Sequence, residues 1–132
     1  MIPAWSGIEK DVPFGRRQLS YVIYSDDGGK TWQHGQPATV DHSDECQVVE
    51  LADGRLYMNA RSRMGKKLRA YCFSSDGGTT WSPIAHHAGM PERSCQGSVL
   101  RVGKNAIVVA HPADTAARRM LTGRLSRDEA RT

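Results

Sequence analysis

Two aspartates occupy the same place in a repeated octet, and their carboxylates are the first candidates for acid–base chemistry. Residues 25–32 read SDDGGKTW and residues 74–81 read SSDGGTTW, so that Asp27 and Asp76 are equivalent. An aspartate in a turn accepts hydrogen bonds from backbone N–H groups one or two residues further on. The Gly-Gly pair supplies the positive φ of a tight hairpin, and the Thr-Trp pair favours the next strand. We therefore interpret Asp27 and Asp76 as turn residues and not as catalytic acids.

The basic residues are spread along the chain and form no run longer than a pair. The 132 residues contain 18 Lys and Arg against 14 Asp and Glu, which gives a formal net charge of +4. A groove for nucleic acid would need a stripe of Lys and Arg interleaved with stacking aromatics, and no such stripe is present. A few well-placed arginines are enough to bind a small anion. The pairs are Arg16-Arg17, Lys66-Lys67 and Arg118-Arg119.

The cysteines and histidines show no metal-binding or disulfide pattern. Three cysteines are present, and Cys46 and Cys95 lie at equivalent places in the repeat, which favours buried strand residues over a disulfide. No two of the five histidines have the i, i+4 spacing of a helical zinc site. We expect no metal and no cofactor.

The octet returns a third time in incomplete form. This copy begins at Ser126, keeps Asp128 and Thr132, and has Ala130 in place of a glycine. The aspartates at 27, 76 and 128 are 49 and 52 residues apart. A period near fifty residues is typical of four-stranded propeller blades, so the sequence predicts an all-β repeat fold.

The order of predicted elements divides the chain into three parts. Residues 1–44 end an incomplete blade with the first octet, residues 45–93 form a complete blade with the second, and residues 94–132 form an incomplete blade that stops inside the third. Alternating runs predict strands at 18–25 and 68–74, and hairpins at 45–61 and 97–111. Residues 1–17 and 82–93 are expected to be loops, with a strand starting at Trp81. No apolar run is long enough to span a membrane.

The octets resemble the Asp boxes of sialidases (exo-α-neuraminidases), and three further segments narrow the resemblance. DECQ at 44–47, followed by NAR at 59–61, is similar to the sialidase segment that carries one catalytic glutamate and one substrate arginine. CQGS at 95–98 resembles the next blade, and residues 111–126 resemble the segment with another substrate arginine. The resemblance implies a six-bladed β-propeller, of which this chain is expected to be the middle portion.

The resemblance also implies roles for individual residues. Glu45 matches the glutamate that activates a nucleophilic tyrosine. Arg61 and Arg118 match the second and third arginines that bind the sialic acid carboxylate, with Arg119 as the competitor for Arg118. Gln96 matches a residue lining the sugar pocket. Without that context, Glu45 could equally be a turn carboxylate and the arginines surface charges.

Two further residues are left open by the sequence. Trp5 is similar to a family aromatic near the substrate. Glu50 could face either the pocket or the solvent, because strand alternation does not decide the matter where a strand is buried on both faces.

The implied chemistry accounts for these residue types. Planar guanidinium groups bind a carboxylate through two parallel hydrogen bonds and stay charged. A carboxylate nucleophile would be repelled by the carboxylate of sialic acid, so the family uses a tyrosine with a glutamate as its base. The implied partners are sialylated glycoproteins, glycolipids and oligosaccharides, with no nucleic acid.

Three groups of the family pattern find no match in this chain. They are the first arginine, the acid/base aspartate and the nucleophilic tyrosine. We therefore expect this chain alone to be inactive and its full-length parent to be a retaining exo-α-sialidase. The alternative is a non-catalytic Asp-box propeller used for binding or scaffolding. The sequence leaves the localisation open, since a secreted and a lysosomal-like parent are both compatible with it.

Overall fold

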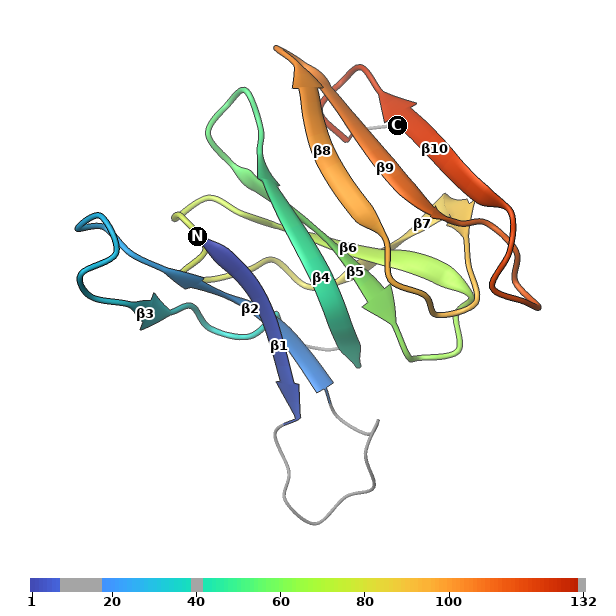
Figure 1. Ribbon diagram of the computed structural model, residues 1–132, viewed down its shortest axis with the longest axis horizontal. Coiled ribbons are helices and arrows are strands. Elements are labelled where there is room, and N and C mark those ends of the chain that lie inside the picture. The colour runs from blue at the N-terminus through green and yellow to red at the C-terminus, as the bar shows by residue number, and fades with distance from the viewer. Residues whose placement is uncertain (8–17, 39–41, 131–132) are drawn as a thin grey trace.

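The computed structural model describes residues 1–7, 18–38 and 42–130, and these form an all-β structure (Figure 1). The described residues contain ten strands in three antiparallel sheets and no helix. Accordingly, no helix that could cross a membrane is found among them. The all-β prediction from the sequence is confirmed.

The first sheet has the order β1-β2-β3. It comprises β1 (Ile2–Gly7), β2 (Gln18–Tyr24) and the short β3 (Gln33–His34). The expectation of a loop over residues 1–17 is wrong for residues 2–7, which pair with β2 from Ile2↔Ile23 to Gly7↔Gln18. Pro3 and Gly7 argued against a strand in the sequence, but an edge strand tolerates proline because one row of its N–H groups needs no partner. Residues 8–17 lie outside the described ranges.

The second sheet has the order β4-β5-β6-β7. It comprises β4 (Ser43–Glu50), β5 (Leu56–Ser62), β6 (Leu68–Ser74) and β7 (Ala85–Pro91). The predicted turn at Ala52-Asp53-Gly54 joins β4 to β5, and Gly54 there has a φ of 83°. The loop predicted over residues 82–93 is wrong for residues 85–91, which form β7 and pair with β6 at Ala70↔His86 and Tyr71↔Ala85. The strand predicted to start at Trp81 begins instead at Ala85.

The third sheet has the order β10-β9-β8. It comprises β8 (Ser98–Gly103), β9 (Ala106–Pro112) and β10 (Leu121–Ser126). The β8–β9 hairpin follows the prediction within a residue or two at each end. The three sheets lie next to one another in chain order, with β4 facing both β1 and β8.

The core lies in two layers on either side of the second sheet. Strand β5 contributes to both, since Met58 and Ala60 pack toward the first sheet while Tyr57 packs toward the third. Burial of both faces of a strand is expected where sheets stack like blades. The first layer consists of Val22, Ala38, Cys46, Met58, Ala60, Ala70 and Cys72, and the second of Leu51, Tyr57, Val99, Ile107, Val109 and Ala130.

The repeated octets form the hairpin turns that their composition predicted. The Asp76 carboxylate accepts bonds from the Thr80 N–H at 2.9 Å and the Thr80 hydroxyl at 2.5 Å, while Gly77 and Gly78 have φ values of 72° and 92°. These bonds, led by that of the Thr80 hydroxyl, lower the pKa of Asp76 to about 2. Asp27 makes the equivalent bonds to Thr31, and its pKa is also lowered to about 2. The two carboxylates thus stabilise the turns in which they lie.

The third octet keeps the same turn without glycine. Ser126 accepts the N–H of Ala130 at 3.0 Å, as Ser74 accepts that of Gly78. Glu129 and Ala130 have φ values of 62° and 63°, in the left-handed region that the glycine pairs occupy in the other copies. Thr132 lies outside the described ranges.

Candidate active site

Glu45 and Arg61 are joined by an ion pair at one end of the second sheet. Arg61 Nη1 lies 2.7 Å from Glu45 Oε2. Glu45 lies near the start of β4, where the pairing with β5 shifts register between Ser43 and Cys46. A bulge of this kind re-aims side chains, and here it directs two consecutive acids toward the end of β5. The two residues that the sequence selected separately are therefore direct partners.

The neighbouring acid, Asp44, is a second partner of Arg61. The Asp44 side chain is 1 % exposed, and its Oδ1 lies 3.6 Å from Arg61 Nε. Its Oδ2 forms an ion pair with Arg63 Nε. Burial of Arg61 disfavours its charge, but the hydrogen bond that Arg61 donates to Glu45 and the charges of Asp44 and Glu45 outweigh this and raise the pKa of Arg61.

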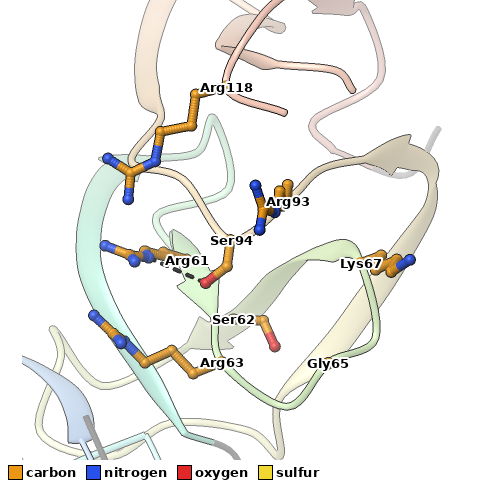
Figure 2. A pocket seen from close by; sticks show the side chains of 8 residues that line it. All are labelled: Arg61, Ser62, Arg63, Gly65, Lys67, Arg93, Ser94 and Arg118. Carbon is orange, nitrogen blue, oxygen red and sulfur yellow. Dashed lines mark hydrogen bonds between the residues drawn. The ribbon is translucent and has the colours of Figure 1, made fainter. Parts of the chain in front are cut away.

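An open pocket of about 520 Å³ extends from Arg61 (Figure 2). Arg118 reaches into it from the β9–β10 connection of the third sheet, so two sheets contribute to the pocket. Figure 2 shows the guanidinium groups of Arg118, Arg61 and Arg63 following one another along one side. The lining residues are Arg61, Ser62, Arg63, Gly65, Lys67, Arg93, Ser94 and Arg118.

The pocket carries an excess of positive charge. Five of its lining side chains are cationic, and two of these, Arg61 and Arg63, lie against carboxylates. Within the part of the chain that the structure describes, Lys67, Arg93 and Arg118 have no carboxylate partner. Such a surface is suited to binding an anion.

The neighbouring arginine, Arg119, has a different place. Its Nε forms an ion pair with Asp114, and its side chain is 69 % exposed. The hydrogen bond from Arg119, followed by those from the N–H groups of Ala116 and Ala117, lowers the pKa of Asp114 to about 2. The structure thus places Arg118, and not Arg119, in the pocket with Arg61.

Gln96 and Trp5 lie in a second hollow, which Glu45 also lines. This hollow has a volume of about 470 Å³ and is lined by Pro3, Trp5, Glu45, Cys46, Gln47, Val48 and Gln96. Glu45 lines this hollow and is connected to the first pocket only through its bond to Arg61, which lines that pocket. Gln96 and Trp5 are brought to Glu45 but do not line the pocket of Arg118. Glu50 is exposed at the far end of β4 and belongs to neither space.

The DECQ segment also fastens the second sheet to both neighbours. The Asp44 carbonyl accepts the Ser20 hydroxyl of β2 at 2.8 Å. Gln47 Oε1 accepts the Val99 N–H of β8 at 3.0 Å. The segment that carries Glu45 is therefore held from both sides, which limits its movement.

Three polar residues of this region were not singled out from the sequence. Ser94 Oγ accepts a hydrogen bond from Arg61 Nε at 3.1 Å, and Asp44 and Arg63 form the ion pair beside it. Arg63 could have been found, because it is two residues from Arg61 and a strand repeats its facing every two residues. The contact of Ser94 depends on a turn between sheets, and no local pattern predicts it.

The described cysteines are unsuited to nucleophilic chemistry. All three are free and buried; Cys46 lies on β4 as predicted, whereas Cys95, which was also predicted on a strand, precedes β8. Burial raises the pKa of Cys46 to about 11 and that of Cys72 to about 12, so their thiols stay protonated at neutral pH. Among the described residues, no group of three or more His, Cys, Asp or Glu side chains could hold a metal ion.

Comparison with known proteins identifies the relatives of this chain. A sialidase from Micromonospora viridifaciens is 30% identical over 119 residues, which cover 83% of this chain and 18% of the relative. Human sialidase-4 is 39% identical over 87 residues, which cover 61% of this chain and 18% of the relative. The chain thus spans about a fifth of the length of these curated relatives.

Solved sialidase structures are also similar to this chain. The Hadza microbial sialidase Hz136 superposes with a TM-score of 0.77 at 30% identity, over 87% of this chain and 24% of that one. The leech intramolecular trans-sialidase complexed with 2,7-anhydro-Neu5Ac gives a TM-score of 0.64 at 27% identity, over 82% of this chain and 18% of that one. The predicted partial β-propeller is confirmed. Residues 3–132 match the BNR repeat-like domain family, so the chain belongs to that family and carries the Asp-box repeats of the sialidases.

Proposed function

We propose that this chain supplies part of the active site of a retaining exo-α-sialidase, which removes terminal sialic acid from glycoconjugates. The observation that carries the proposal is the Glu45–Arg61 ion pair of 2.7 Å beside a pocket that Arg118 enters from the neighbouring sheet. The sialidase relatives support the substrate class. Sialic acid carries a carboxylate on its anomeric carbon, and a cluster of guanidinium groups is its natural receptor.

Arg61 and Arg118 would bind the substrate carboxylate together. Nε and Nη1 of Arg61 are engaged by Ser94 and Glu45, and Nη2 is the nitrogen left for an incoming carboxylate oxygen. Arg118 has no carboxylate partner among the described residues and reaches the same pocket. Binding the carboxylate at two points would fix the anomeric carbon relative to Glu45.

Glu45 would act as the base for a tyrosine nucleophile of the parent protein. It takes the phenol proton while the phenolate oxygen attacks the anomeric carbon and the leaving alcohol receives a proton from an acid. Water then displaces the tyrosine with the proton transfers reversed, so that the configuration is retained. No tyrosine lines either space beside Glu45 in the described chain, and we expect the isolated chain to be inactive.

The test uses the full-length parent and a fluorogenic sialoside. We expect Glu45→Ala and Arg61→Ala nearly to abolish turnover. Arg119→Ala is the matched control, because this exposed arginine is bound to Asp114 away from the pocket, and it should keep near wild-type activity. Full activity in purified Arg61→Ala would reject the assignment, and binding of sialosides without turnover by the wild-type parent would favour a non-catalytic propeller.

A further inference from the structure

A fully buried arginine lies beneath the turn that contacts Arg61. Arg69 on β6 is 0 % exposed, and its side chain is surrounded by polar partners. Nε and Nη2 donate to Asn59 Oδ1 at 3.0 and 2.7 Å, and Nη1 donates to Glu92 Oε2 at 2.7 Å. Nη1 also donates to the carbonyl oxygen of Cys95. A buried charge is tolerated only when it is paired and hydrogen-bonded in this way.

The partners of Arg69 bracket the turn that carries Ser94. Glu92 Oε2 accepts the Cys95 N–H at 3.4 Å, and the Glu92 N–H donates to the Lys67 carbonyl at 2.9 Å. Between them, Ser94 has a φ of 54°. A non-glycine residue keeps this left-handed conformation only where its surroundings impose it. Arg69 and Glu92 hold both ends of the turn and so impose it.

Close packing confirms that the turn rests directly on the guanidinium of Arg69. A Cβ atom added at Gly97 would lie 3.0 Å from Arg69 Cζ and 3.0 Å from the Ala110 carbonyl oxygen. A larger residue at position 97 would therefore require the Ala110 carbonyl or the Arg69 guanidinium to shift. The segment from Glu92 to Gly97 is therefore fitted around a single side chain.

We propose that Arg69, Glu92 and Ser94 are positioning residues for Arg61. The Ser94 hydroxyl, held by the Arg69–Glu92 clamp, accepts the Arg61 Nε–H at 3.1 Å and fixes the plane of that guanidinium. Glu45 fixes Nη1 in the same plane, so that Nη2 has one direction toward the pocket. Neither Arg69 nor Glu92 lines the pocket, and both act through Ser94. The inference rests on the proposed function for the role of Arg61.

The first experiment tests Ser94 in the full-length parent. Ser94→Gly removes the hydroxyl and suits the positive φ, and we expect kcat/KM to fall about tenfold, the size expected for one hydrogen bond to a charged group. Arg61→Lys has no Nε, so adding Ser94→Gly to it should lower kcat/KM no further. Ser75→Gly, at an exposed serine of the second octet, is the matched control. A tenfold loss in both backgrounds, or no loss in either, would overturn the proposal.

The second experiment tests the clamp. The double variant Arg69→Met/Glu92→Met removes both buried charges together, because either change alone would leave an unpaired charge. We expect it to lose activity as Ser94→Gly does, and the triple variant with Ser94→Gly to lose little more. Arg69→Gln/Glu92→Gln, which also removes both charges but keeps polar side chains, serves if the first double variant does not fold. Wild-type kcat/KM in the folded variant would show that the clamp has only a structural role.

A further readout does not depend on turnover. In nitrogen-15 spectra of the parent, the Arg61 Nε–H resonance, assigned with Arg61→Lys, should exchange with water faster in Ser94→Gly and in the clamp variant. An inactive parent that shows this change would reject the proposed function and keep the clamp. An active parent that shows no change would reject the clamp and keep the proposed function.

Discussion

Replacing Asp44 by asparagine tests whether one buried carboxylate holds the two arginines at the end of β5. The change keeps the shape of the side chain and removes its charge. Asp44 Oδ1 lies 3.6 Å from Arg61 Nε, and Oδ2 is bonded to Arg63. The carboxylate is 1 % exposed and the arginine side chains are 11 % and 27 % exposed, so solvent screens the pairs only in part.

The structure sets the size of the effect. A pair of unit charges near 4 Å is worth about 4 kcal/mol at an effective dielectric constant of 20. Breaking a buried pair costs about 3–5 kcal/mol, and the partial exposure of both arginines lowers this value. We therefore expect Asp44→Asn to reduce the unfolding free energy by about 2–3 kcal/mol.

Thermal unfolding of the full-length parent, followed by calorimetry, measures this loss. Asp53→Asn is the matched control, because Asp53 is also paired with an arginine, Arg55, but its side chain is 47 % exposed. Exposed ion pairs contribute little to stability. If Asp44→Asn shifts the melting temperature no more than Asp53→Asn does, the carboxylate does not hold the arginines and the reasoning fails.

Three further predictions concern the turns, the close contact at Gly97 and the sheet edges. Asp76→Ala should lower the melting temperature with kcat/KM unchanged at low temperature. Because the pKa of Asp76 is lowered from 3.8 to about 2, the contribution of this carboxylate to stability is complete above about pH 4 and is lost as the pH falls through 2. Acid unfolding of the wild type and the variant will measure this difference. Gly97→Ala should destabilise the parent by about 1–3 kcal/mol, because the new Cβ would lie against the Ala110 carbonyl oxygen, which β9 holds in place. An unfolding free energy equal to that of the wild type in denaturant unfolding would contradict this. The 132-residue chain alone should show a broad thermal unfolding transition, because apolar side chains such as Leu121, which is 81 % exposed, lie on an edge strand. One sharp, reversible transition of a monomer would contradict this.

The parts of the fold that could be predicted from sequence are those with local causes. The turns of the first two octets combine an aspartate with two glycines within a few residues, and the β4–β5 hairpin has its turn at Asp53-Gly54, so each could be predicted from local sequence. Strand β7 could not, because its sequence AHHAGMP shows neither alternation nor β-branched residues. It becomes a strand by pairing with β6, which is a tertiary effect that overrides propensity.

The residues of the site likewise divide into those that could be predicted from sequence and those that could not. The resemblance selected Glu45, Arg61 and Arg118, and the structure brings Glu45 to Arg61 and Arg118 to the same pocket. Arg69 was missed, because a charged residue within a strand ordinarily indicates a solvent-exposed position. Its partner Glu92 lies 23 residues further along the chain, and nothing in the intervening sequence indicates that the two meet.

Strand direction explains why the turns and the pocket lie at opposite ends of the sheets. In an antiparallel sheet β4 begins where β5 ends, so Glu45 and Arg61 must share one end, and β6, which starts there, must deliver the second octet to the other. The octet carboxylates bond to their own backbone and fix the connections at that end. The connections after β5, β7 and β9 are free of this constraint and carry Arg63, Arg93 and Arg118. The charge of the pocket can therefore change with little effect on the turns that define the fold.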